Sequence, residues 1–568
     1  MDNKEAGRIF HEVAFWLEIA GENAFKIRSY ANAARLLEKL AEPVEELHRS
    51  GRLRELDGIG EALEKKIDEL LTTGRLSFLE MLRSRFPEGL LDLSKVQGIG
   101  PKTIKHLYDS LFVDSIEALR DACERDEVAS LKGYGKHKQD KILESIRFLE
   151  AQEGRFHLHV AWDAANALCR RLEEHPAVKE LAVVGNLRRY RETVKEIEVL
   201  AAGGDREAII SHFLEGPEIK ESLSSTPEKI AVITATNIPA SLRVITDTTW
   251  PFPLLHFSGN EAHVTLLRNR ARERGLELNE YGLFRKDGTP VPCAGETEIY
   301  EALGMHFIPP EMREGTFECK APFPACLIEE HHLLGTIHCH SHWSDGVNSL
   351  EEMALEARRL GYAYIVVTDH SQASAIANGL SPERVCDQHE EIDRLNTRLP
   401  GIRILKGIEA DILGDGSLDY GPEILSAFEF VIASIHNGME MSEEAATEKL
   451  IRAIEHPSTT VIGHLTGRLL LSRAGYPVQV DKVVDAAVAN GVALEINGNP
   501  RRLDMDWRFL RAAADKGARF ALGTDAHRVS GLANMRFAVA MARKGGLEPE
   551  QILNCYPAED ILQWRAAN

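Results

Sequence analysis

Histidines and acids stand at the ends of apolar runs in the C-terminal part of the chain. Seven runs between residues 335 and 528 read G-T-I-H-C-H, Y-A-Y-I-V-V-T-D-H, I-R-I-L-K-G-I-E-A-D, F-E-F-V-I-A-S-I-H, T-T-V-I-G-H, V-A-L-E-I-N-G-N and R-F-A-L-G-T-D-A-H. Apolar runs of this length predict buried parallel strands, whose ends gather at one rim of a barrel. Together with the aspartate of the S-D-G that follows the first run, the rim would hold nine residues of metal-ligand type: His338, His340, Asp345, His370, Glu409, His436, His464, Asp525 and His527.

This residue set predicts a site for several metal ions. Imidazole and carboxylate groups suit Zn²⁺, Mn²⁺ or Fe²⁺, and Cys339 faces away because it alternates with the two histidines beside it. Nine ligands exceed the needs of one ion, so we expect two or three ions that share a bridging acid, for which Glu409 is the candidate. Clustered ions activate water and hold the attacking and leaving oxygens of a phosphate ester. The sequence therefore predicts a metal-dependent phosphoesterase.

The same pattern resembles the PHP (polymerase and histidinol phosphatase) family. The family's H-x-H, S-D-G, T-D-H, G-I-E, S-x-H, G-H and D-x-H elements are all present, in order, at the nine positions above. The resemblance implies a distorted (β/α)7 barrel whose nine residues bind Mn²⁺ and/or Zn²⁺ and catalyse phosphoester hydrolysis. His342, Asp369 and Arg468 lie near these positions and are further candidates for substrate contact.

Three segments in the N-terminal part share one form, an apolar residue, a G-x-G turn and a helix that carries lysines. They are L-D-G-I-G-E-A-L-E-K-K-I, V-Q-G-I-G-P-K-T-I-K-H-L and L-K-G-Y-G-K-H-K-Q-D-K-I. Paired glycines let backbone N–H groups approach a phosphate at the positive end of a helix. The segments resemble helix-hairpin-helix elements, which hold the DNA backbone without reading sequence; a purely structural hairpin is the alternative. The predicted DNA contacts are Gly58, Gly60, Gly98, Gly100, Lys102, Gly133, Gly135 and Lys136.

The whole chain resembles a bacterial family X DNA polymerase with an appended PHP domain. Beyond the three hairpins, the matching segments are G-N-L-R-R-Y-R-E-T-V-K-E-I-E, L-L-H-F-S-G-N, L-E-L-N-E-Y-G-L-F and F-I-P-P-E-M-R-E. The resemblance implies a multidomain α/β protein. The expected parts are an N-terminal helical, lyase-like DNA-binding domain (1–85), a fingers-like helical region (86–154), a nucleotidyltransferase-like α+β palm (155–245), a thumb-like region (246–310), a linker (311–334) and the PHP domain (335–568).

The palm departs from the polymerase pattern at its catalytic positions. Asn186 replaces a phosphate-contacting serine, Glu196 and Glu198 replace an aspartate pair, and Ser241 replaces the third aspartate. Polymerases use that trio to hold two metal ions, and misplacing such groups by about 1 Å costs about 100-fold in rate. We therefore expect polymerase activity to be weak or lost, with Glu196 and Glu198 as weak candidates for one Mg²⁺ or as a solvated strand face. The degenerate nucleotide pocket, with a deoxynucleoside triphosphate as its possible ligand, comprises Gly185, Asn186, Arg189, Ser241, His256, Phe257 and Gly259.

Lys66 follows the first hairpin at the position where some family members place a Schiff-base lysine. The resemblance implies a possible lyase role on deoxyribose phosphate. That role needs a lowered pKa. Lys65 and several acids surround Lys66, so a solvated helix face or a phosphate contact is the alternative.

Length and composition indicate a multidomain protein without membrane spans. The chain has 568 residues, 44% hydrophobic, and a formal net charge of −21, so DNA binding must rest on local sites. It contains no run of about 18 apolar residues and no apolar signal core at the start. Eight cysteines without C-x-x-C spacing favour reduced thiols and a cytoplasmic location. The oligomeric state is left open.

These observations predict a DNA-repair protein, of the kind that serves base excision repair. It would bind gapped, nicked or abasic duplex and hydrolyse phosphoester bonds at the PHP site, as a 3′-5′ exonuclease, in 3′-end processing or in abasic-site cleavage. Three alternatives stay open: a working gap-filling polymerase with a PHP nuclease, a non-catalytic DNA-end scaffold with structural metals, and a small-molecule phosphatase. The hairpins argue against the last, because such a substrate needs no DNA grip.

Overall fold

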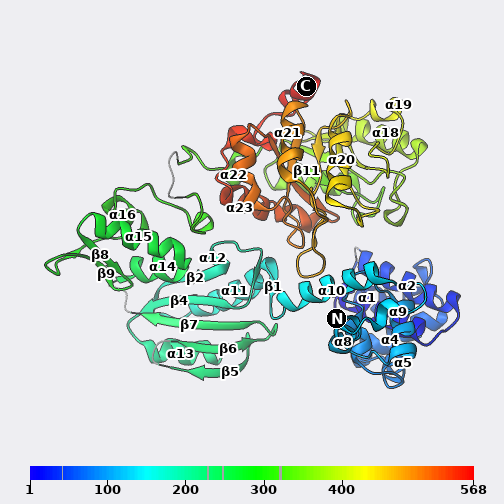
Figure 1. The fold of residues 1–568 in the computed structure, drawn as a ribbon, viewed down its shortest axis with the longest axis horizontal. Helices are drawn as coiled ribbons and strands as arrows, with labels where there is room; N and C mark the ends of the chain where they lie inside the picture. The colour runs from blue at the N-terminus through cyan, green and yellow to red at the C-terminus, as the bar shows by residue number, and fades with distance from the viewer. Residues whose placement is uncertain (41, 227–228, 246–248, 319–322, 568) are drawn as a thin grey trace. The chain divides into compact units, whose positions relative to one another are not determined.

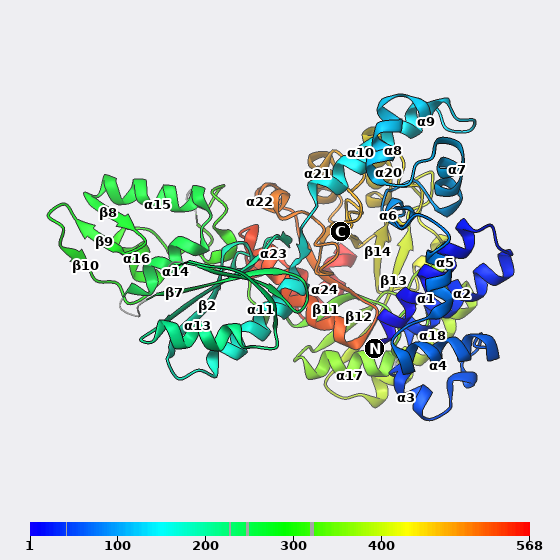
Figure 2. The same cartoon turned by 90° about the horizontal axis from the view of Figure 1, so that it is seen from below.

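The chain divides into two compact units. The first holds residues 1–153, and the second holds nearly all of residues 154–568. The computed structural model describes every residue except 41, 227–228, 246–248, 319–322 and 568 (Figures 1 and 2). Asn568 and residues 319–322, which include Cys319, lie outside these described residues although they fall within the predicted PHP domain and linker.

The first unit is helical throughout its described residues and has its own apolar core. Its helices are α1 (Asn3–Ile19), α2 (Ala24–Lys39), α3 (Val44–Arg49), α4 (Glu61–Thr73), α5 (Ser77–Arg83), α6 (Gly89–Leu93), α7 (Pro101–Leu111), α8 (Ile116–Glu124), α9 (Glu127–Ser130) and α10 (Lys136–Ala151). Trp16 and Leu17 are fully buried at its centre. The prediction that this region consists of helices joined by glycine turns is confirmed.

The second unit begins with a five-stranded mixed sheet, the palm. The strand order is β2-β4-β7-β6-β5, with β4 and β7 parallel and the remaining pairs antiparallel. Helices α11 and α13 pack against it, and α12 forms a short turn between its first strands (Figure 1). The elements are β1 (Phe156–His157), α11 (Leu158–Glu173), β2 (Val178–Val184), α12 (Gly185–Arg188), β3 (Thr193–Val194), β4 (Ile197–Gly203), α13 (Arg206–Leu214), β5 (Ile219–Ser225), β6 (Ile230–Thr234) and β7 (Pro239–Ile245).

A small helical layer with a three-stranded sheet follows the palm and forms the thumb. Its elements are α14 (Pro251–Ser258), α15 (Glu261–Glu273), β8 (Leu276–Asn279), β9 (Gly282–Arg285), β10 (Pro290–Val291) and α16 (Glu296–Ala302). The start of the predicted linker packs into this layer. Arg313 is fully buried and pairs with Glu296 at 2.6 Å, and Glu318 pairs with the buried His263 at 3.1 Å.

Seven parallel strands close into a barrel in the last part of the second unit. Strand β11 pairs with both β12 and β17, so the sheet has no free edge, as the predicted strand runs require. The strands are β11 (Gly335–Cys339), β12 (Tyr364–Val367), β13 (Arg403–Asp411), β14 (Phe430–Ser434), β15 (Val461–Ile462), β16 (Ala493–Asn497) and β17 (Phe520–Ala526). The predicted barrel fold is confirmed.

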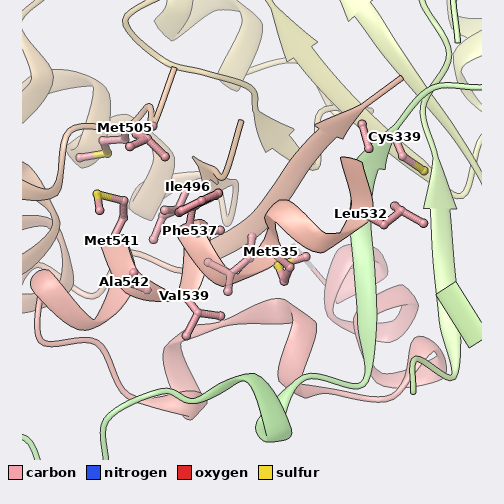
Figure 3. Close-up of a cluster of buried hydrophobic side chains, with 14 of the residues drawn as sticks. Cys339, Ile496, Met505, Leu532, Met535, Phe537, Val539, Met541 and Ala542 are labelled. Atoms are coloured by element: carbon pink, nitrogen blue, oxygen red, sulfur yellow. The ribbon is translucent and has the colours of Figure 1, made fainter. Parts of the chain in front are cut away.

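Helices surround the barrel and bury its outer face. They are α17 (Leu350–Arg359), α18 (Pro382–Arg398), α19 (Pro422–Leu425), α20 (Glu443–Ile454), α21 (Val480–Ala489), α22 (Trp507–Asp515) and α23 (Met535–Lys544). Figure 3 shows part of this layer, where Phe537 and Met541 of α23 lie near Ile496 of β16. Packing of this kind fixes the strands, and with them the side chains at the strand ends.

The barrel interior is filled by alternate strand residues and is capped by the last helix. Ile337, Val366 and Phe430 share one buried cluster with Ile561 of α24 (Ala558–Ala567). One end of the barrel is therefore closed by apolar packing. The opposite, carboxyl-terminal ends of the strands remain for chemistry, as in other parallel barrels.

None of the helices within the described residues is long and apolar enough to cross a membrane. The described cysteines are all free thiols, from the buried Cys123 and Cys339 to the exposed Cys326 and Cys386. No disulfide therefore constrains the described part of either unit.

Candidate metal centre

The strand ends bring all nine predicted residues into one cluster. Four groups have ligand atoms close enough to share an ion: His340, Asp345, His370 and His527; His338, His340 and Asp525; His338, Glu409 and His464; and His370, Glu409 and His436. These groups overlap, because several residues belong to two of them. Within the described residues, no group of this kind occurs outside the barrel.

Glu409, at the end of β13, lies at the centre of the cluster. Its Oε1 is 3.0 Å from His464 Nε2 and 3.2 Å from His436 Nε2, and its Oε2 is 3.0 Å from His370 Nδ1. Burial alone would raise the pKa of Glu409, but the histidines, His436 foremost, hold that pKa well below its usual value. A carboxylate that faces several groups at once has the geometry of a bridging ligand.

Three of the cluster residues have unusual backbone conformations, which set the directions of their side chains. His338, His464 and Asp525 have positive φ angles of 62°, 23° and 49°. The register of β11 shifts around His338 against both neighbouring strands, which is a bulge. Side chains rarely adopt this region of φ, and such residues cluster at functional sites where the surrounding structure enforces them. The packed barrel supplies that enforcement here.

Buried polar atoms without hydrogen bonds indicate that the cluster suits metal ions. His338 Nε2, His340 Nε2 and Asp345 Oδ1 are buried and make no hydrogen bond within the described part of the chain. Buried polar atoms are normally paired, because leaving one unpaired costs about 1–3 kcal/mol. Divalent cations bind imidazole nitrogens and carboxylate oxygens that point toward a common centre. The residues therefore fit the metal ions that their types predict.

A second layer of acids holds the candidate ligands, and the sequence analysis missed it. Glu495 of β16 is buried, accepts from His464 N at 2.6 Å and lies 2.5 Å from His338 Nδ1. Asp411 Oδ1 lies 2.5 Å from His436 Nδ1. A charged residue inside the apolar run V-A-L-E-I-N was the signal that could have revealed Glu495. Acids in this position fix the orientation of metal-binding histidines.

We expect Glu495→Gln to weaken metal binding by about 10- to 100-fold, the usual loss for such a second layer. The amide keeps the shape but removes the charge that orients His338. Isothermal titration with Mn²⁺ measures the change. Glu390→Gln, an exposed acid on α18, is the matched control. An affinity within twofold of the wild type would contradict the assignment.

Arg468, a candidate phosphate contact, is engaged elsewhere. It donates to Arg502 O at 3.0 Å and pairs with Asp506 at 2.6 Å, and its other nitrogen lies 3.9 Å from Glu192 of the palm. Burial would raise the pKa of Glu192, but Arg508 and then Arg468 hold it at about 2. These pairings give Arg468 a structural role.

Asp369 also has a structural role. It is fully buried and accepts from Ser341 Oγ at 2.6 Å, from Ser344 Oγ at 2.5 Å and from Gln388 Nε2 at 2.6 Å. Its oxygens are therefore occupied by the loop that leads into Asp345 and by Gln388 of α18. His342 is exposed beside this loop.

The described residues of the palm do not assemble a comparable site. Glu198 of β4 is paired in register with Ser241 of β7, and Ser241 is 2% exposed. Glu196 precedes β4 and pairs with Lys229 at 3.0 Å. Burial, and then Glu196, raise the pKa of Glu198. No candidate metal group within the described residues includes either glutamate.

Residues of the predicted nucleotide pocket contact one another and their neighbours in the chain. Arg189 is buried, donates to Asn186 Oδ1 at 2.6 Å and to Ser258 O, and lies 3.6 Å from Glu314. His256 is 3.4 Å from Arg268. Three further predicted members are Gly185, Phe257 and Gly259. The Glu198 carboxylate packs against Gly185, Phe257 lies under Arg243, and Gly259 has a φ of 59°.

The three hairpins have the geometry that backbone contacts require. Gly58, Gly98 and Gly133 have φ near 90°, and α4, α7 and α10 begin directly after Gly60, Gly100 and Gly135. A Cβ at any of these glycines would meet nothing within 4 Å, so the turns are open. Lys102 is exposed, whereas Lys136 pairs with Asp126 at 2.5 Å. Their DNA contacts stay a prediction.

Lys66 lies on α4 with its ammonium 4.1 Å from the centre of the Phe78 ring. Lys26 also approaches that ring, at 5.3 Å. Burial lowers the pKa of Lys66, Lys26 lowers it further, and Glu69 opposes both. A lowered pKa suits a nucleophile, but the lyase role stays a prediction.

Comparison with known proteins gives matches along the whole chain. A helix-hairpin-helix domain model matches residues 1–76, a SAM-like helix-hairpin-helix tandem matches 90–147, a DNA polymerase beta thumb matches 253–314 and a PHP domain matches 336–499. The chain is 36% identical over 565 residues to a Bacillus subtilis protein named DNA polymerase/3′-5′ exonuclease PolX, covering 99% of each. Its C-terminal part is 30% identical over 217 residues to a "probable phosphatase" of Thermoanaerobacter (36% of this chain, 84% of that one) and 30% identical over 231 residues to one of Syntrophotalea carbinolica (38% and 90%).

Proposed function

The chain belongs to the bacterial family X DNA polymerases that carry a C-terminal PHP domain, and we propose that its working active site is the barrel's metal centre, which hydrolyses phosphoester bonds in DNA. The matches to the helix-hairpin-helix and thumb models imply DNA binding. The reaction we propose is removal of nucleotides or blocked ends from a 3′ terminus, with cleavage of abasic strands as a related reaction. Its role would lie in DNA repair.

One observation carries the proposal: nine side chains converge at the barrel rim while the palm trio has lost its third acid. We propose all nine as metal ligands and Mn²⁺ or Zn²⁺ as the ions. When bound, such ions activate water and neutralise charge on the phosphate. The chain's own part is to hold the ligands: Glu409 lies among the histidines and would bind the ions with them, and Glu495 and Asp411 fix two histidines.

The other regions would deliver the substrate. The open glycine turns before α4, α7 and α10 would hold the DNA backbone of gapped, nicked or abasic duplex. The palm would support DNA without extending it, because Ser241 is buried and Arg189 is paired with Glu314. Lys66 is the candidate nucleophile if the first unit also has lyase activity.

A panel of labelled duplexes tests the proposal. Purified protein with Mn²⁺ is incubated with gapped, abasic and 3′-phosphate DNA, beside the His338→Ala, His340→Ala double variant. We expect the wild type to shorten or dephosphorylate 3′ ends and the double variant to be inactive. A wild type that binds these duplexes without cleaving any of them would indicate the scaffold alternative. Hydrolysis of small phosphate esters alone would indicate the small-molecule phosphatase.

A further inference from the structure

The loop after His370, residues 371–380, presents one apolar side chain to solvent. Ile376 lies in the short helix η5 (Ala375–Ala377) and is 95% exposed, the most of any large hydrophobic side chain in the described part of the chain. Ala375 is exposed and Ala377 is half-buried, so Ile376 is flanked in the chain by two small residues. A singly exposed apolar residue is common on protein surfaces. The attachment of this loop distinguishes Ile376 from such residues.

The loop is tied to two of the candidate ligands. At its ends, Leu380 N donates to His370 O at 2.9 Å, so the loop closes on the histidine it follows. In its middle, Ser374 Oγ donates to Asp411 Oδ1 at 3.0 Å, and the same oxygen lies 2.5 Å from His436 Nδ1. Ile376 is two residues from Ser374, about 4–7 Å along the chain.

The far side of the loop is tied to a third candidate ligand. Asn378 Nδ2 donates to Ser344 O at 3.1 Å, and Ser344 directly precedes Asp345. Gly379 packs so closely on Ser371 O that an added Cβ would lie 1.9 Å from it. Contacts on three sides fix the loop, so Ile376 has a defined position on a loop whose other residues contact His370, Asp411 and Ser344.

We propose that Ile376 is a wedge that contacts the terminal base pair of DNA and helps to separate the strand end that enters the metal centre, an inference that rests on the proposed function. A paired end must unstack before its 3′ phosphoester can reach a buried site, and that unstacking opposes cleavage. Apolar side chains, isoleucine among them, hold base steps apart by inserting between them. A β-branched side chain suits this role because its χ1 angle is restricted.

Three substrates separate this role from catalysis: a blunt duplex, the same strand unpaired, and thymidine 5′-(p-nitrophenyl phosphate), which has no base pair to open. We expect Ile376→Ala to lower the rate on the duplex by about tenfold, the effect of losing a buried apolar contact of this size. Rates on the unpaired strand and on the small ester stay within twofold of the wild type. Val488→Ala, a truncation of an exposed side chain on α21, leaves all three unchanged.

An equal loss on all three substrates, or no loss on the duplex, overturns the wedge. A second measurement is made with EDTA in place of the metal, so that it does not depend on cleavage. A duplex with 2-aminopurine at its 3′ end becomes more fluorescent when that base unstacks, and we expect this rise with the wild type but not with Ile376→Ala. If the wild type cleaves nothing, the proposed function fails and the fluorescence alone decides the wedge: equal signals with both proteins overturn it.

Discussion

Glu409→Gln is expected to lower phosphoester hydrolysis by at least about 1000-fold, because it removes several kcal/mol of charge stabilisation at the metal centre. The carboxylate is buried and lies within 3.2 Å of three histidine nitrogens, from His370, His436 and His464. A neutral amide would supply no negative charge to bound ions, and its NH₂ group would face the histidine nitrogens from one side. Initial rates on a 3′-labelled strand with Mn²⁺ measure the effect.

The exposed Glu390 provides the control for charge loss, since Glu390→Gln lies on the same domain away from the cluster. Circular dichroism establishes that both variants keep the barrel. A Glu409→Gln protein that is folded and retains a tenth or more of the wild-type rate would exclude a bridging role. The metal content of the variant, measured by mass spectrometry, distinguishes loss of ions from loss of turnover.

The second prediction with a large effect concerns templated DNA synthesis, an activity that we expect to be weak or lost in the wild type. On a one-nucleotide gap with Mg²⁺ or Mn²⁺, the wild type should show little or no extension, because Ser241 offers no charge and Glu196 is paired with Lys229. Restoring the trio by Glu196→Asp, Glu198→Asp and Ser241→Asp should raise extension by at least about 100-fold, the scale on which misplaced catalytic groups reduce rates.

Gap filling by the wild type that disappears in Glu196→Ala would contradict this expectation and favour the alternative of a working polymerase. Denaturing gels of the extended primer, with hydrolysis suppressed by His338→Ala, measure the two activities separately. The triple variant also tests whether the pairing of Arg189 with Glu314 blocks the nucleotide. If the restored trio still gives no product, loss of the trio is not by itself what limits synthesis, and the prediction is wrong.

The sequence predicted the barrel and its nine rim residues because each strand carries its own local signal. An apolar run followed by histidine or an acid is visible in a few residues, and parallel strands bring their ends together without further information. The glycine turns before α4, α7 and α10 were predictable for the same reason. The pairing of Glu495 with His338 was not predictable, because one acid within an apolar run does not reveal a partner 157 residues away.

By itself the sequence determined the order of the domains, the residue types at the rim and the serine at position 241, where the family resemblance implies a third palm acid. The tertiary structure alone decided the partners of the side chains. It paired Arg468 with Asp506, buried Ser241 in the sheet and tied the loop of Ile376 to Asp411 through Ser374. The reason is physical: residue type and spacing are local properties, whereas burial and pairing depend on segments that meet only when the chain has folded.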